Sequence, residues 1–309
     1  MVGQEEGTEM ARDNQVTNSR DASEPIEVIE TMLTTGDGIN IFVRAWVPGN
    51  PQGVLVCVQG LGGHGGYYEE LARQLVLDGT LLVAPDLRGH GHSDGPRGDI
   101  DSFDCYLADI DAVVSWVSDA WRDKSIFILG ESMGASIAIQ YIASPQYRMN
   151  PIHIAGLVLV SPVLRSAIRP TSGEVIHYIS SLLLAPIRPS IVITGREELG
   201  CRDPDFNDRL RADPLFVRLV SARFLTRLTM WLWQSARKAH QITLPLLVLL
   251  GECDYVASRA GTSAFLRHVL ARSQRIVTFP KAYHSLLHDP DTPAVLKVLA
   301  AWLAAYSRM

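Results

Sequence analysis

A serine that could act as a nucleophile lies where a predicted strand turns sharply into a predicted helix. Ser132 is the centre of a G-x-S-x-G sequence at residues 130–134, between a buried apolar run (126–129) and a helical pattern (133–142). Small residues must flank the serine in such a turn, which exposes its hydroxyl at the helix N-terminus. The backbone N–H of Met133 is then free to donate to a developing oxyanion. The pattern predicts attack on an acyl carbonyl, although the same spacing also occurs in ordinary turns.

A serine hydroxyl is a weak nucleophile near neutral pH, so this chemistry needs a base and a carboxylate that orients the base. Asp254 and His284 each follow a predicted strand, and they come after Ser132 in the order Ser, Asp, His. Because the carboxyl ends of parallel strands lie at one edge of a sheet, we expect the three side chains to meet there. Glu252 is the alternative acid and His288 the alternative base; if neither is catalytic, both are solvated loop residues.

The second oxyanion donor is expected in the glycine-rich turn at residues 59–64. Glycines let this part of the backbone approach a substrate closely. We assign the donor to the backbone N–H of Leu61, with Gly60 and Gly62 as the neighbouring alternatives. If the turn is not catalytic, its glycines only reverse the direction of the chain.

Alternating strands and helices must position these residues. Short apolar runs bounded by turn residues predict the strands, and apolar residues at helical spacing predict the helices. The first two strands flank Gly36-Asp37-Gly38 as a hairpin, and the later strands are predicted to be buried on both faces. The predicted strands are residues 30–35, 39–46, 54–58, 80–84, 126–129, 156–160, 246–250 and 275–279, and the predicted helices are residues 67–77, 103–121, 133–142, 261–270 and 292–306. This alternation indicates an α/β fold with a mostly parallel, doubly wound sheet.

A long insertion interrupts the alternation. About 80 residues separate the strands near positions 160 and 246, whereas such connections usually contain about 2 to 6 residues. We therefore predict a helical cap at residues 164–243, inserted between two parts of the core at residues 26–163 and 244–309. Residues 1–25 are predicted to form a disordered tail.

The predicted cap contains two amphipathic segments. Residues 175–183 and 224–232 have helical spacing, whereas the acidic, proline-bearing segment 195–214 is predicted to be irregular. The apolar faces of the two helices fit packing against the core. They also fit an apolar lid that makes transient contact with a membrane surface.

The composition is that of a globular protein of enzyme size. The 309 residues are 47% hydrophobic, and 28 basic against 33 acidic residues give a net charge of −5, so nucleic acid is not an expected partner. The cysteines lack C-x-x-C spacing, and we expect them to be reduced. They are Cys57, Cys105, Cys201 and Cys253. With no signal segment and no apolar run near the roughly 20 residues that cross a bilayer, the predicted location is cytoplasmic, peripheral at membranes where the cap touches them.

The same glycines also fit a different class of enzyme. Gly60, Gly62 and Gly65 match the dinucleotide pattern G-x-G-x-x-G after a strand, and Asp86 ends the next predicted strand, as in NAD-binding oxidoreductases. That interpretation places the pattern in the wrong strand-helix unit, and it leaves the serine, the aspartate and the histidine without a function. We therefore expect no NAD.

A metal site is a further alternative. His90, His92 and Asp94 resemble the start of a metallo-hydrolase ligand set, but the next residue is Gly95, where such a set has histidine. We expect neither a metal nor an organic cofactor. A third class, a ligand-binding protein without catalysis, is disfavoured because the serine, histidine and aspartate are all present.

Six motifs taken together resemble the monoacylglycerol lipase and lysophospholipase branch of the α/β-hydrolases, over about residues 28–307. They are QGLGGH (59–64), PDLRGHGHSDG (85–95), GESMG (130–134), DPL (213–215), GECD (251–254) and AYH (282–284). The sequence departs from the family at two positions. Gln59 stands where the family usually has histidine, and Cys201 stands where it commonly has serine.

The resemblance implies a triad of Ser132, Asp254 and His284, with Leu61 and Met133 as the oxyanion amides. It implies hydrolysis of carboxylic esters of single-chain acyl lipids through an acyl-enzyme, a helical cap, and no cofactor. Within the hydrolases, the alternative is a carboxylesterase, lactonase or peptidase that acts on a small acyl substrate.

Overall fold

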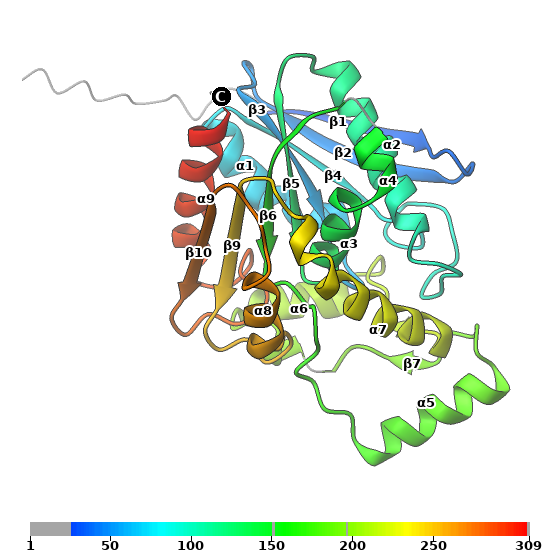
Figure 1. Ribbon diagram of the computed structural model, residues 1–309. Helices are drawn as coiled ribbons and strands as arrows, with labels where there is room; N and C mark the ends of the chain where they lie inside the picture. Colours follow the sequence, from blue (N-terminus) through cyan, green and yellow to red (C-terminus); the bar gives the residue numbers. More distant parts are fainter. Residues whose placement is uncertain (1–25, 150–151, 196, 308–309) are drawn as a thin grey trace, which may run out of the picture.

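A single sheet forms the centre of the molecule (Figure 1). The computed structural model describes residues 26–149, 152–195 and 197–307, so the predicted tail at residues 1–25 lies outside the described residues. The sheet has eight strands in the order β1-β2-β4-β3-β5-β6-β9-β10, and all neighbours are parallel except the pairs β1/β2 and β2/β4. The strands are β1 (Glu27–Thr34), β2 (Asn40–Val47), β3 (Gly53–Val58), β4 (Thr80–Pro85), β5 (Ser125–Glu131), β6 (Ile154–Val160), β9 (Leu246–Gly251) and β10 (Gln274–Phe279).

Helices cover both faces of the sheet because side chains alternate between the two faces along each strand. Val54, Val56 and Val58 of β3 pack in one core with side chains of α2, α3 and α8. Leu55 and Cys57 pack in a second core with side chains of α1 and α9. The helices outside the insertion are α1 (Glu69–Leu77), which follows the 3₁₀ turn η1 (Gly65–Tyr68), α2 (Cys105–Ala120), α3 (Met133–Ile142), α4 (Pro145–Met149), α8 (Arg259–Leu266) and α9 (Thr292–Tyr306).

The insertion between β6 and β9 is called the cap segment here and comprises residues 164–243. Its helix α7 contacts α3 of the core, whereas α5 contacts α7 and extends away from the body of the protein (Figure 1). Thr171 and Glu174 form a capping box at the start of α5, so this exposed helix has a specified N-terminus. The elements are α5 (Ser172–Leu184), β7 (Ile191–Val192), η2 (Glu197–Leu199), α6 (Pro204–Ala212), β8 (Leu219–Val220), α7 (Ala222–Arg237) and η3 (Ala239–Gln241), and β7 pairs with β8.

The structure confirms the α/β class and corrects two local predictions. β10 is not buried on both faces; Phe279 alone of its six residues is buried, because β10 is an edge strand. The cap segment is not irregular over residues 195–214, because it contains α6. Asp203 caps this helix by accepting from backbone N–H groups, and Pro204 stands at its first position. None of the described helices has both the length and the apolar character that a bilayer span requires.

Candidate active site

Ser132 occupies the turn between β5 and α3 in a strained conformation. Its backbone φ of 56° is a left-handed value that residues other than glycine rarely adopt. A Cβ on Gly134 would lie 2.1 Å from the carbonyl oxygen of Val58, and one on Gly130 would lie 2.5 Å from Cα of Ala135. The backbone can therefore make this turn only with glycine on both sides of the serine.

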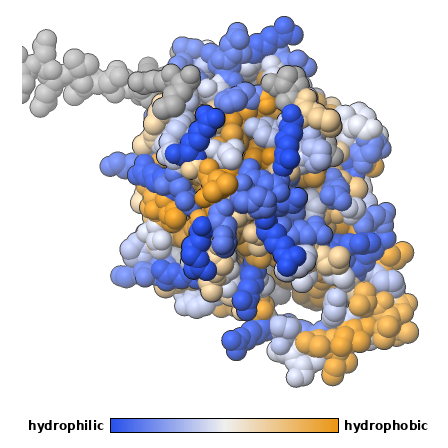
Figure 2. Space-filling model, in the orientation of Figure 1, coloured by the Kyte–Doolittle hydropathy of each residue, from blue (hydrophilic) through white to orange (hydrophobic). Residues whose placement is uncertain are grey.

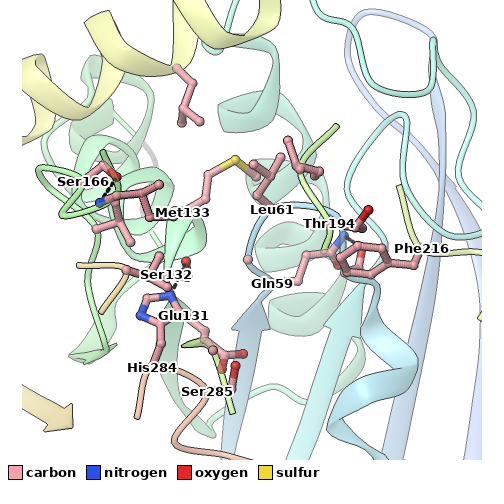
Figure 3. A pocket seen from close by; sticks show the side chains of 18 of the residues that line it. Gln59, Leu61, Glu131, Ser132, Met133, Ser166, Thr194, Phe216, His284 and Ser285 are labelled. Carbon is pink, nitrogen blue, oxygen red and sulfur yellow. Dashed lines mark hydrogen bonds between the residues drawn. The ribbon is translucent and has the colours of Figure 1, made fainter. Parts of the chain in front are cut away.

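A chain of hydrogen bonds joins the three side chains predicted to act together (Figure 3 shows its Ser132–His284 end). Nε2 of His284 lies 2.8 Å from Oγ of Ser132, and Nδ1 lies 2.8 Å from Oδ2 of Asp254. The second oxygen of Asp254 accepts from the backbone N–H groups of Val256 and Ala257, both at 2.8 Å. These amides fix the carboxylate, which in turn favours the tautomer with the proton on Nδ1. Nε2 is then free to accept the serine proton.

The sheet topology explains why residues so far apart in the sequence meet. Ser132 follows β5, Asp254 follows β9 and His284 follows β10, and β6 alone separates β5 from β9 in the sheet. All of these strands are parallel, so their carboxyl ends lie at one edge.

The glycine-rich loop after β3 packs against the serine. A Cβ on Gly60 would lie 3.1 Å from Cβ of Ser132, and the next residue, Leu61, lines the pocket beside Ser132. Met133 is the first residue of α3, so its N–H has no acceptor within the helix. This arrangement can offer two backbone donors to an oxyanion formed at Ser132.

Gln59 holds the loop from one side. Its Nε2 donates to the carbonyl oxygen of Gly63 at 2.7 Å, whereas its buried Oε1 has no hydrogen-bond partner among the described residues. Gly62, one of the alternative donors, has a φ of 84°, and a Cβ there would lie 2.7 Å from the ring of Phe216 in the cap segment. The glutamine thus hydrogen-bonds across the loop to Gly63, and the loop also packs against the cap segment at Phe216.

The alternative acid and base lie outside the hydrogen-bonded chain. Glu252 is exposed, as expected for a solvated loop residue. His288 is not solvated; its ring stacks on Phe206 with centroids 4.1 Å apart and lines the pocket. Burial lowers the pKa of His288 to about 4, so the ring is neutral near pH 7.

Ser132 lies at the base of a cavity of about 790 Å³ (Figure 3). Core residues form its floor, and the cap segment contributes side chains of α5, β7, α6 and α7 to its walls. Most of the lining is apolar. Apolar lining residues include Leu61, Met133, Val163, Val175, Ile191, Leu225, Leu228 and Leu232. The wall contributed by α6 could not be predicted from the sequence, because no periodic pattern marks that short helix.

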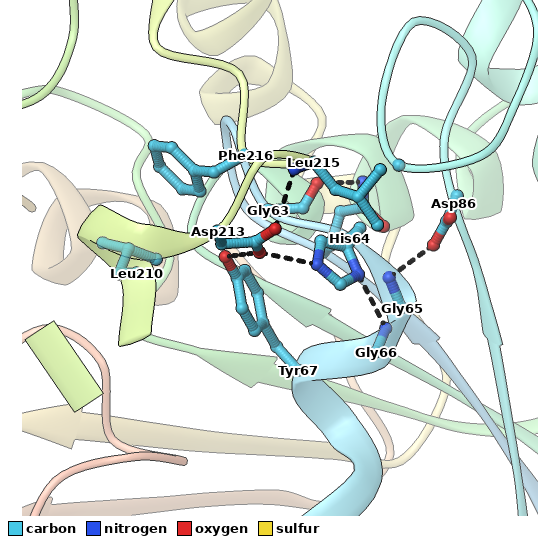
Figure 4. A network of polar contacts seen from close by, with 12 residues as sticks. Gly63, His64, Gly65, Gly66, Tyr67, Asp86, Leu210, Asp213, Leu215 and Phe216 are labelled. Carbon is cyan, nitrogen blue, oxygen red and sulfur yellow. Dashed lines mark hydrogen bonds and ion pairs between the residues drawn. The ribbon is translucent and has the colours of Figure 1, made fainter. Parts of the chain in front are cut away.

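A polar cluster fastens the cap segment beside this cavity (Figure 4). Asp213 accepts from the hydroxyl of Tyr67 at 2.5 Å and pairs with Nε2 of His64 at 2.8 Å. Nδ1 of His64 accepts from the N–H of Gly66, so Nε2 carries the proton shared with Asp213. Burial opposes ionisation, but hydrogen bonds from Tyr67, Leu215 and His64 hold the pKa of Asp213 below its usual range.

Two arginines of the cap segment add ion pairs to the core. Arg202 binds the buried carboxylate of Asp289, and it also reaches Asp291 at 2.7 Å. Arg223, in the first turn of α7, pairs with Asp99. Side-chain contacts at Arg202, Asp213 and Arg223 therefore fix this part of the cap segment to the core, and none of them involves α5.

Residues of the NAD-binding and metal-site alternatives form hydrogen bonds within the core. Both oxygens of Asp86 accept backbone N–H groups, from Gly65 and His92, so the aspartate braces the loop before α1. His90 is hydrogen-bonded to the carbonyl of Arg88. Among the described residues, no group of three His, Cys, Asp or Glu side chains is arranged to hold a metal ion.

The cysteines are free thiols. Cys201, the second departure from the family pattern, is buried where the cap segment meets the loop after β10. Its Sγ donates to the carbonyl of His288 and accepts from the N–H of Asp203. A thiol thus fills this position with the same donor and acceptor roles that a hydroxyl would have.

The chain is similar to known hydrolases over most of its length. Residues 49–291 match the model of the family described as serine aminopeptidase, S33. The chain is 31% identical to the monoglyceride lipase of Homo sapiens, with 88% of this chain and 89% of the lipase covered. It is 26% identical to the monoacylglycerol lipase of Mycolicibacterium smegmatis, with 87% and 94% covered.

Solved structures show the same similarity. The monoacylglycerol lipase of Paleococcus ferrophilus superposes with a TM-score of 0.73 at 26% identity, covering 86% of this chain and 99% of the other. A soluble variant of the monoglyceride lipase of Saccharomyces cerevisiae shares the fold, with a TM-score of 0.77 at 18% identity and coverage of 92% and 97%. The chain belongs to the serine aminopeptidase S33 family and, within the α/β-hydrolases, to the branch that contains the monoacylglycerol lipases.

Proposed function

We propose that the protein is a serine hydrolase that cleaves carboxylic esters of single-chain acyl lipids, of the monoacylglycerol lipase or lysophospholipase type. The observation that carries the proposal is the hydrogen-bonded chain of Ser132, His284 and Asp254 at the base of a mostly apolar cavity of about 790 Å³. The printed names of the relatives, which include monoglyceride lipases and a phospholipase, support a lipid substrate.

In the proposed mechanism, Oγ of Ser132 attacks the ester carbonyl while Nε2 of His284 takes its proton. Asp254 stabilises the imidazolium and remains ionised. The N–H groups of Leu61 and Met133 stabilise the oxyanion, each by about 3 kcal/mol. His284 then gives its proton to the departing alkoxide. Water enters, His284 acts again as the base, and the fatty acid leaves.

The apolar lining of the cavity supports a substrate with an acyl chain. Each methylene group that leaves water for an apolar wall stabilises the complex by about 0.8 kcal/mol. The side chains of α5, β7 and α7 provide such a wall beyond the serine. Longer acyl chains should therefore bind more tightly until the cavity is filled.

The surface of α5 supports transient contact with a membrane. Apolar side chains gather over this helix (Figure 2), and Ile176 and Leu183 are 67% and 76% exposed. A helix with an exposed apolar face can lie in the interface of a bilayer with that face in the lipid. We infer that α5 contacts the membrane, and that substrate enters the cavity beneath it.

The test is the release of free fatty acid from monoacylglycerols of increasing chain length, alongside hydrolysis of p-nitrophenyl acetate, for the wild type and Ser132→Ala. Preference for long chains together with an inactive variant would support the proposal. Hydrolysis of the small ester alone would leave the serine mechanism and reject the lipid substrate, so lactones and aminoacyl amides would be assayed next. Activity of Ser132→Ala equal to that of the wild type would reject the mechanism.

A further inference from the structure

Glu131 is a second carboxyl group beside the proposed nucleophile. It ends β5 directly before Ser132, and its side chain lines the cavity together with those of His284 and Ser285 (Figure 3). Its Oε2 accepts a hydrogen bond from the buried hydroxyl of Tyr68 at 3.1 Å. Among the described residues, no lysine or arginine forms a salt bridge with it. The mechanism through Ser132, His284 and Asp254 does not use this carboxyl group.

The titratable groups that interact with Glu131 come from four parts of the fold. Tyr68 belongs to the 3₁₀ turn before α1, Cys57 to β3, Cys201 to the cap segment, and His284 to the loop after β10. Burial raises the pKa of Tyr68 and of Cys57 well above their usual values, and it raises the pKa of Cys201 to about 11. These three are therefore uncharged near pH 7. His284 is the one member of this group that can become a cation.

We propose that Glu131 is a positioning residue that acts through His284: as a carboxylate it stabilises the imidazolium that forms when Ser132 gives up its proton. The inference rests on the proposed function. As the bond from Oγ to the carbonyl carbon forms, the proton moves to Nε2 and a positive charge develops on the ring. Asp254 faces this charge at Nδ1, and Glu131 faces it from the wall of the cavity. When the proton passes to the leaving alkoxide, the ring becomes neutral again.

The surroundings of Glu131 shift the pH range in which this carboxyl group ionises. Burial raises the pKa of Glu131, against the opposite effects of His284 and of the hydrogen bond from Tyr68. The protonated acid cannot stabilise an imidazolium, whereas the carboxylate can. The contribution of Glu131 to catalysis should therefore increase as the pH rises through the range in which the group ionises.

The test compares the wild type with Glu131→Gln, which keeps the shape of the side chain and removes its titration. We would measure the pH dependence of kcat/KM for p-nitrophenyl butyrate between about pH 5 and 9. The ratio of wild-type to variant kcat/KM should be near one where Glu131 is protonated and rise to about tenfold where it is ionised. Glu131→Asp, which keeps a carboxylate, should retain part of this rise.

Tyr68→Phe provides an independent variant. Loss of a donor to the carboxylate raises the pKa of Glu131 further. In the Tyr68→Phe background, the rise of the same ratio should therefore move to higher pH. Thermal melting would confirm that each variant is folded. If Glu131→Gln does not fold, the pH profile of Tyr68→Phe alone decides, because its alkaline increase in kcat/KM must then shift upward.

The possible outcomes separate the role of Glu131 from the proposed mechanism. A ratio that is constant across the pH range, even if it is large, would indicate a structural role and overturn the proposal. An unshifted rise in the Tyr68→Phe background would also overturn it. Retained hydrolysis by Ser132→Ala under the same conditions would reject the proposed mechanism itself, whereas an inactive Ser132→Ala with a flat ratio rejects only the role of Glu131.

Discussion

Asp254 and Glu252 are carboxylates two positions apart, and their surroundings make them different. Asp254 accepts two backbone N–H groups and contacts His284, whereas Glu252 is exposed to solvent. We expect Asp254→Asn to lower kcat for a p-nitrophenyl ester about 10⁴-fold, because the amide favours the wrong imidazole tautomer. The matched control, Glu252→Gln, should leave kcat unchanged. A loss of activity in the control, with activity retained in Asp254→Asn, would exchange the two assignments.

In the turn between β5 and α3, Gly134 has no room for a side-chain atom. A Cβ there would lie 2.1 Å and 2.6 Å from the carbonyl oxygens of Val58 and Gln59, which belong to the rigid backbone. Gly134→Ala should therefore lower the melting temperature and abolish esterase activity. Gly173→Ala in α5 is the control, because no atom lies within 4 Å of the added Cβ. It should leave the melting temperature unchanged or raise it slightly, by a stabilisation of about 0.5 kcal/mol. Equal melting temperatures and equal esterase activities of the two variants would contradict this account.

The ion pair between the cap segment and the loop after β10 should be sensitive to acid. Burial opposes ionisation of Asp289, but hydrogen bonds from Arg202 hold its pKa below the usual range. A lowered pKa stabilises the fold above the unfolded-state pKa of about 3.9, and this stability is lost as the pH falls through the folded-state value. Asp289→Asn should therefore lower the free energy of unfolding by about 2 kcal/mol at pH 7. The difference from the wild type should shrink as the pH falls below about 4.

The control for this measurement is an ion pair of the same kind at the surface. Asp208 pairs with Arg211 at 2.8 Å on α6, with 75% of its side chain exposed. Asp208→Asn should change the free energy of unfolding by less than about 0.5 kcal/mol, both at pH 7 and below about pH 4. Chemical denaturation under these two conditions would measure the free energy of unfolding of both variants. A pH-independent effect of Asp289→Asn would indicate a loss of packing instead of a loss of charge.

At the scale of the whole molecule, the exposed apolar surface of α5 should matter only when the substrate is in a lipid phase. Leu183 is 76% exposed, and burial of a leucine in lipid stabilises the bound state by about 1.5 kcal/mol or more. Leu183→Glu should therefore lower hydrolysis of monoacylglycerol in vesicles about tenfold or more, with p-nitrophenyl acetate hydrolysis unchanged.

A control for surface hydrophobicity as such is available outside the cap segment. Leu270 follows α8 and is 63% exposed. Leu270→Glu should leave the hydrolysis of both substrates unchanged. Vesicle flotation would measure binding directly. Equal loss of vesicle activity in both variants would show that apolar exposure in general, and not α5 in particular, supports membrane contact.

The sequence by itself determined the features that depend on local spacing. G-x-S-x-G between a buried run and a helical pattern predicted the turn at Ser132, because only small residues permit so sharp a reversal. The alternation of strands and helices predicted the parallel sheet, and the helices at residues 133–142 and 292–306 have the predicted bounds. Residues directly after parallel strands were predicted to share one edge, which is where Asp254 and His284 lie.

The tertiary structure alone decided the features that depend on contacts between distant segments. The order of strands in the sheet made β10 an exposed edge, although its sequence fits a buried strand. Asp213 meets Tyr67 across 146 positions of sequence, and no local pattern carries that information. The same holds for His288, which stacks in the cavity wall, and for Glu131, whose surroundings come from four parts of the chain. Spacing identifies elements and strand ends, whereas charge state and cavity shape arise only when separate elements pack together.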